Sequence, residues 1–108
     1  MKEDQTFPNN IIKIGENARE NDDLVAASSQ SDIWFHLDSL PSCHVVIKCD
    51  TKNPITKQMI NYCAQLCKDN TKYRNQKVKV KYTEIKNVKR TTTPGMVTIK
   101  GKSNTITL

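Results

Sequence analysis

The feature that most constrains the fold is a pair of short apolar segments separated by a proline-containing turn. In residues 32–38, DIWFHLD, apolar and polar side chains alternate, as in a β-strand with one face buried. Residues 43–49, CHVVIKC, contain a continuous Val-Val-Ile run, which is typical of a strand buried on both faces. The intervening residues, SLPS, have the composition of a turn. The sequence therefore predicts a central antiparallel hairpin.

Two helices are predicted on either side of this hairpin. The first is short, with Asn21 or Asp22 as its N-cap and carboxylates in its first turn. The second is indicated by apolar residues that recur every three or four positions across residues 55–66. For this helix we expect Asn53 as the N-cap and Pro54 in the first helical position, where a missing N–H is tolerated.

The remaining strands are predicted at residues 10–15 and 77–84, with two more within residues 96–108. The resulting order, β-α-β-β-α-β-β-β, defines an α+β domain with a mostly antiparallel sheet and two helices packed on it. A chain of 108 residues allows one domain. We expect a flexible N-terminus at residues 1–10 and a single domain at residues 11–108.

Charge is distributed unevenly along the chain. Residues 1–67 carry a net charge of −3, whereas residues 68–108 carry +9. A basic surface of this kind attracts polyanions. The chain has fourteen Lys and three Arg, so a lysine-rich, solubilising surface is the simpler alternative. A bias in amino-acid usage does not explain why the positive excess lies in the last third.

Six cations fall within fourteen residues of this basic part. The first three alternate with apolar residues, so they occupy one face of the predicted strand. Repeated positive charges of this kind position the phosphates of a nucleic acid. The alternative is a solvated strand face that prevents edge-to-edge aggregation, and the pattern favours neither. The six cations are Lys77, Lys79, Lys81, Lys86, Lys89 and Arg90.

Residues 36–49 also raise the question of a metal or catalytic site. His36, Cys43, His44 and Cys49 lie close in sequence, but they lack the paired spacing of a zinc knuckle. Cys43 and His44 are neighbours in a predicted strand and therefore point to opposite faces, which argues against a nucleophile and its base with Asp38 as orienting acid. The chain also lacks a glycine-rich loop. We expect no enzyme activity, metal or cofactor, and no small-molecule substrate.

The cellular location is predicted from segments that the sequence lacks. The chain has no apolar run long enough to cross a bilayer and no secretory signal at its start, so we expect a cytoplasmic protein with reduced cysteines and no membrane partner.

Trp34 is either part of a second core layer or an exposed stacking platform. Its size favours the core.

Beyond these patterns, the order of motifs resembles one known family. Residues 15–47, GENARENDDLVAASSQSDIWFHLDSLPSCHVVI, are similar to the NFACT-R domain, the RNA-binding part of tRNA-recruiting factors of ribosome quality control and of small stand-alone relatives. The likeness continues through residues 80–97, with the basic element VKR and the turn PGMV. This sequence departs from the family pattern between Pro41 and His44, where a glycine is absent and Cys43 is added.

The resemblance implies a nucleic-acid-binding module that is linked to translation or ribosome quality control. Its expected partners are RNA (tRNA or rRNA) and the ribosome. A protein-interaction module that docks on an acidic partner is the alternative, because the same basic face would serve it. For the polar residues near the hairpin, contact with RNA and mutual hydrogen bonding within the loop both stay open. Together with the six cations, the expected RNA-binding residues are Asn17, Arg19, Asn21, His36 and His44.

Overall fold

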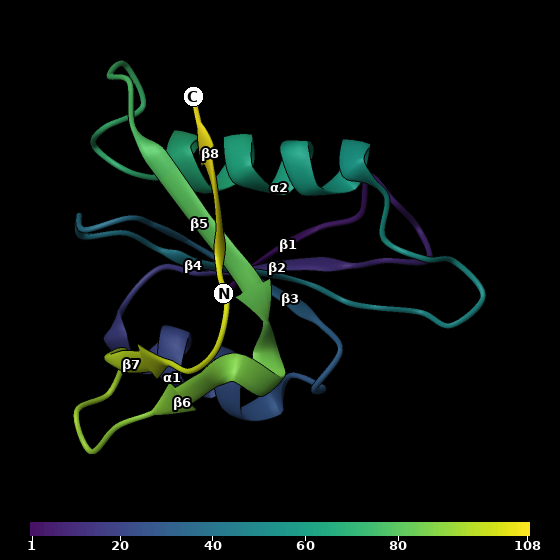
Figure 1. Ribbon diagram of the computed structural model, residues 1–108, viewed down its shortest axis with the longest axis horizontal. Helices are drawn as coiled ribbons and strands as arrows, with labels where there is room; N and C mark the ends of the chain where they lie inside the picture. Colours follow the sequence, from purple (N-terminus) through teal and green to yellow (C-terminus); the bar gives the residue numbers. More distant parts are fainter.

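A six-stranded sheet with one layer on each face forms the domain, as the computed structural model of residues 1–108 shows (Figure 1). The α+β class and the mostly antiparallel sheet with two packed helices are confirmed, with two further short strands, β1 and β6. The elements in chain order are β1 (Lys2–Asp4), β2 (Ile12–Gly15), α1 (Ala18–Ala27), β3 (Ile33–Leu37), β4 (His44–Ile47), α2 (Lys57–Asp69), β5 (Lys79–Glu84), a 3₁₀ turn (Ile85–Asn87), β6 (Val88–Arg90), β7 (Val97–Ile99) and β8 (Asn104–Thr107).

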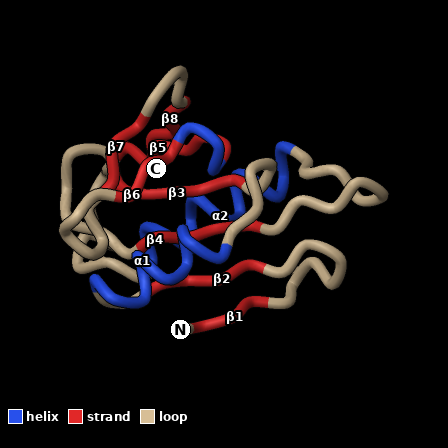
Figure 2. Tube along the Cα trace, turned by 90° about the horizontal axis from the view of Figure 1, so that it is seen from below, coloured by secondary structure: helices blue, strands red, loops and turns tan.

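The strand order of the sheet is β1-β2-β4-β3-β5-β8, and every neighbouring pair is antiparallel. The predicted hairpin of β3 and β4 lies at its centre, with Phe35 opposite Val45. Helix α2 covers one face, whereas α1 and the separate β6–β7 hairpin cover the other (Figure 1). Seen from below, α1 lies across β4 and β2 (Figure 2).

The alternation of residues along the strands divides the core into two parts. Phe35 and Leu37 point toward α2, where they join its buried residues Cys63 and Cys67. Trp34 points to the opposite face and is 1% exposed, packed with residues of α1 and β6. The prediction that Trp34 belongs to a second core layer is therefore confirmed. All four residues of β4 are buried, as its continuous apolar run predicted.

Both predicted helix starts were wrong. Helix α1 begins at Ala18, because Asn17 is its N-cap and accepts a hydrogen bond from the Glu20 N–H over 2.9 Å. The polar first turn hid this start from an argument based on apolar periodicity. Helix α2 begins at Lys57, three residues after the expected start, with Thr56 as its N-cap.

The N-terminal segment, which we expected to be flexible, contains a strand and a buried side chain. Residues 2–4 form β1, which pairs with β2 at the edge of the sheet. Asn10 is 1% exposed, and its side-chain amide donates to the carbonyls of Lys48 and Asn53 over 3.1 and 2.8 Å. Backbone pairing and amide hydrogen bonds of this kind leave no apolar pattern in the sequence.

Neither helix has the length and apolar character that crossing a bilayer requires.

Candidate nucleic-acid interface

A row of residues, one from each of five neighbouring strands, runs across the sheet on the α1 side. Gly15 of β2 lies opposite His44 of β4, and His36 of β3 lies opposite Lys81 of β5. Lys81 in turn lies opposite Thr105 of β8. The rings of His36 and His44 meet edge to face with their centroids 5.0 Å apart, which joins the two halves of the row. Residues far apart in sequence are thus aligned across the sheet.

His44 is a buried link between the layers. Its side chain is 1% exposed, and Nδ1 accepts a hydrogen bond from Nε1 of Trp34 over 3.1 Å. Its backbone N–H donates to Oδ1 of Asn21 over 3.2 Å. Burial, and secondarily the nearby His36, lower the pKa of His44 to about 4, so the ring is neutral at pH 7. His44 therefore connects β4 to β3 and α1 and does not present a surface contact.

Asn21 and Gly15 explain why the helix can approach the sheet at this point. A Cβ atom on Gly15 would lie 2.3 Å from Oδ1 of Asn21, so only glycine leaves room for that amide. Gly95, with φ of +82°, also lies against α1, because a Cβ atom on it would be 3.0 Å from Cα of Ala18. Together with the cap formed by Asn17, these contacts hold the start of α1 in place.

His36 has a different environment from His44. It is half-exposed, and its ring stacks on the buried Trp34 with centroids 5.5 Å apart and planes 15° apart. Nδ1 lies 2.6 Å from the carbonyl oxygen of Leu37, so it carries the proton and leaves Nε2 as an acceptor. Burial lowers the pKa of His36, and the charge of Lys81 adds to this effect. The neutral ring is therefore favoured.

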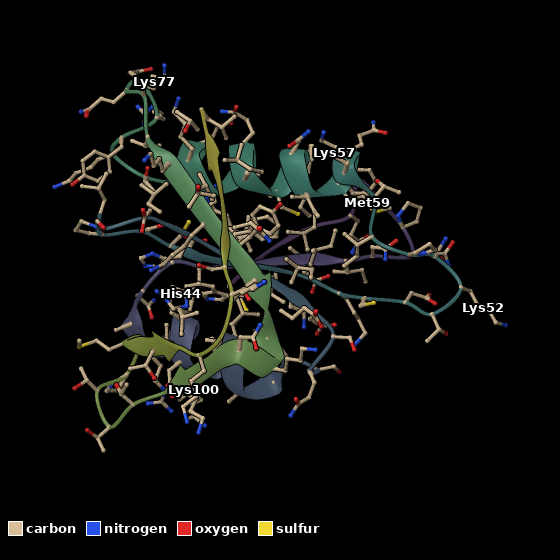
Figure 3. All side chains as sticks on the ribbon, in the orientation of Figure 1. His44, Lys52, Lys57, Met59, Lys77 and Lys100 are labelled. Carbon is tan, nitrogen blue, oxygen red and sulfur yellow. The ribbon has the colours of Figure 1, made fainter.

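The two histidines border a cleft of about 510 Å³ between the start of α1, the end of α2 and the turn at residues 94–96. A second cavity of about 210 Å³ adjoins it and is lined by Trp34 and Lys81. Both are lined by His36, His44, Gly95 and Met96. Figure 3 places His44 on the α1 side of the sheet, close to β7. The cleft thus opens where β3 and β4 meet the α1 layer.

Beside the cleft, two of the predicted cations lie on one open part of the sheet. Lys79 lies opposite Thr107, and Lys81 lies opposite Thr105, all on the α1 side. Lys79, Thr105 and Thr107 are exposed, and Lys81 is half-exposed. We call these four residues the β5–β8 strip. Its ammonium and hydroxyl groups are the kinds of donor that contact phosphate and sugar oxygens.

Several of the other predicted cations lie beside partners of their own. Arg90 forms a bidentate ion pair with Asp22, from Nε to Oδ1 over 3.0 Å and from Nη2 to Oδ2 over 2.7 Å. The two residues are 68 positions apart, so no local sequence pattern indicated this pair. Lys86 lies 3.7 Å from Glu84. Lys77 and the β6–β7 hairpin, marked by Lys100, lie at opposite ends of the molecule (Figure 3).

Two more of the predicted site residues have local roles. Lys89 lies within hydrogen-bond reach of Lys100, and this contact together with the charge of Lys100 lowers the pKa of Lys89. Arg19 is exposed and lies 3.8 Å from Asp23, one helical turn later. Sequence reasoning also missed cleft residues, including Lys2, Asn70 and Met96. Met96 is 61% exposed, and its place after a Pro-Gly turn was the one signal that pointed to it.

No group of three or more His, Cys, Asp or Glu side chains is arranged to hold a metal ion. All four cysteines are free thiols. The cleft is lined by amide and imidazole groups together with Lys2, Glu16 and Cys43, and the adjoining strip adds ammonium and hydroxyl groups.

Comparison with known proteins decides the family. The model of the NFACT protein RNA binding domain matches residues 3–105. The chain belongs to this family. A solved structure, the C-terminal part of the fibronectin/fibrinogen-binding protein from Streptococcus suis, superposes with a TM-score of 0.81 and 30% identity over 95% of this chain and 42% of that one. The resemblance seen in the sequence is confirmed.

Curated relatives share the domain but are longer. Coiled-coil domain-containing protein 25 of Danio rerio is 36% identical over 91 residues, which are 78% of this chain and 43% of the relative. The homologue from Dictyostelium discoideum is 34% identical over 89 residues, again 78% of this chain and 43% of the relative. The chain thus spans about two fifths of the length of these relatives.

Proposed function

We propose that this NFACT-R domain binds RNA along the β5–β8 strip, as a cytoplasmic module linked to translation or ribosome quality control, with tRNA or ribosomal RNA as its target. The observation that carries the proposal is the position of Lys79 and Lys81 beside Thr105 and Thr107 on an open part of the sheet. Cations and hydroxyl groups spaced along strands match the repeat of phosphates and sugars. Membership of an RNA-binding family supports the same conclusion.

The hydrogen bonding and burial of His44, the histidine that follows Cys43, favour binding over catalysis. His44 uses Nδ1 to accept the Trp34 hydrogen bond, and its ring is buried. Cys43 instead lies against α2, where its Sγ is 3.5 Å from the carbonyl oxygen of Cys67. A nucleophile needs its base within hydrogen-bond reach, and this pair belongs to opposite faces of the sheet. We therefore propose a binding role and no enzyme activity.

An acidic protein partner is the second candidate, because Lys89 and Lys100 on the β6–β7 hairpin form a separate positive site. The two candidates differ in which cations they need. RNA binding on the strip depends on Lys79 and Lys81, whereas a partner held by the hairpin depends on Lys89 and Lys100.

The test measures binding of the purified domain to tRNA and to an unstructured RNA at two salt concentrations. A protein that neutralises phosphates loses affinity steeply as salt rises. We expect Lys79→Ala with Lys81→Ala to weaken binding and flatten its salt dependence. The control is Lys52→Ala with Lys57→Ala, which removes the same charge on the opposite side of the molecule from His44 (Figure 3). Absence of binding at low salt, or an equal loss in the control, would reject the proposal.

A further inference from the structure

The cleft beside the strip has properties that phosphate binding does not explain. Its only lysine, Lys2, lies 4.0 Å from the carboxylate of Glu16 and donates to Asn70 over 3.2 Å. His36 and His44 are kept neutral by burial. The single lysine of the cleft is balanced by the Glu16 carboxylate and the two histidines are uncharged, so the cleft suits an uncharged polar group.

Asn21 supplies an unused donor in this cleft. Its side chain is 7% exposed, and Oδ1 is fixed as the acceptor of the His44 N–H. Nδ2 makes no hydrogen bond within the protein. Every side-chain nitrogen or oxygen that is sealed from solvent has a partner, so Nδ2 is in contact with solvent. Because Asn21 lines the cleft, this NH₂ group opens into it. A buried amide that is half-satisfied by its own protein is a ready partner for a ligand carbonyl or ring nitrogen.

His36 and Met96 supply the complementary features. Nε2 of His36 is an acceptor without a partner, since the proton is on Nδ1. The ring is backed by Trp34, which holds it at a fixed angle. Met96 borders both cavities and is 61% exposed, so an adaptable apolar side chain lies at the entrance.

We propose that the cleft binds one unstacked base of the RNA whose backbone lies on the β5–β8 strip. A base is a neutral, flat group with donors and acceptors on its edge, and single-stranded RNA is recognised by stacking and by contacts to such edges. Nδ2 of Asn21 and Nε2 of His36 form the donor and acceptor for the base edge, and Met96 covers its face. Because His36 lies directly opposite Lys81, the base and the adjoining phosphate reach neighbouring strands. This inference rests on the RNA binding proposed above.

The test compares two RNAs of equal length: an unstructured oligouridylate and the same strand with abasic sites in place of its bases. We expect Met96→Ser to weaken binding of the oligouridylate about tenfold and to leave binding of the abasic strand unchanged, since one base loses the apolar side chain that covers its face. Met96 is exposed, so this variant keeps its fold. His36→Asn is the second variant, with thermal unfolding as the check of its stability. Lys57→Ala is the control.

A second readout comes from Trp34, the only tryptophan, which lies directly under His36. Oligouridylate is expected to change its fluorescence, whereas the abasic strand leaves it unchanged. Equal binding of both RNAs to the native protein, or unaltered oligouridylate affinity in Met96→Ser, would overturn the base site while binding on the strip stands. If the native protein binds neither RNA at low salt, the proposed function itself is rejected.

Discussion

Nε1 of Trp34 donates a hydrogen bond to Nδ1 of His44 over 3.1 Å, and this contact connects the two strands that carry the sequence signature of the domain. It requires an unprotonated Nδ1, so His44 must be neutral. The same histidine is held to α1 by Asn21, which fits only because residue 15 is glycine. Trp34, His44, Asn21 and Gly15 therefore form the frame of the cleft. The groups available to a ligand are those that this frame leaves without a partner.

The first prediction concerns the pH dependence of stability. The pKa of His44 is about 4 in the folded protein and near 6.5 in the unfolded chain, so only the unfolded state takes up a proton as pH falls between these values. From this group alone, the free energy of unfolding should fall by about 2 kcal/mol from pH 7 to pH 5 and by about 3 kcal/mol below pH 4. Urea unfolding followed by Trp34 fluorescence measures the change.

The control for this experiment is His44→Asn. Its absolute stability will differ, but its loss between pH 7 and pH 5 should be smaller, because only the half-exposed His36 contributes in the same direction. The carboxyl groups with lowered pKa values, such as Asp4 and Asp22, act mainly below this window. An unchanged pH dependence in the variant would show that the buried, neutral His44 is not its source.

The second prediction is that Gly15→Ala destabilises the fold. The new methyl group would lie 2.3 Å from Oδ1 of Asn21 and 3.0 Å from its backbone, so α1 has to shift or release His44. Forced overpacking of this kind costs about 1–3 kcal/mol. Glu16→Ala, at the exposed neighbouring position, should change stability by less than about 0.5 kcal/mol. Equal unfolding midpoints for the two variants would show that the close approach is unimportant.

The sequence predicted the parts of this domain that depend on local patterns. Alternation in residues 32–38 and the apolar run of β4 gave the hairpin and placed Trp34 in a second core layer. The start of α1 was missed because its cap, Asn17, and its polar first turn lack apolar periodicity. The ion pair of Arg90 was missed for a different reason: its partner, Asp22, is 68 residues away in the sequence. Charge neutralisation between distant segments has no local signature.

The third prediction concerns the cysteines. Cys43 and Cys49 are half-exposed, whereas Cys63 and Cys67 are fully buried against β3 and β4. Burial raises the pKa of the Cys63 thiol, and the Cys43 neighbour together with burial raises that of Cys67, so neither forms a thiolate near pH 8. Maleimide labelling followed by mass spectrometry should therefore modify at most two thiols in the native protein.

All four thiols should react once guanidinium chloride unfolds the chain. Cys49→Ser is the matched variant, since it removes one half-exposed thiol and should lower the native count from two to one. Rapid labelling of four thiols under native conditions would be incompatible with the packing of α2 on the sheet.

The last prediction separates free cations from neutralised ones. Arg90 is held by both oxygens of Asp22, and this pairing lowers the pKa of that carboxyl group. Arg90→Ala should therefore weaken RNA binding less than Lys81→Ala does, although both remove one positive charge. Asp22→Asn should have the opposite effect and strengthen binding, because it releases the guanidinium of Arg90 for phosphate contact. Fluorescence anisotropy with a labelled RNA at low and moderate salt measures all three variants. If Arg90→Ala costs as much affinity as Lys81→Ala, phosphates compete successfully for the ion pair, and the interface extends from the β5–β8 strip onto the β6–β7 hairpin.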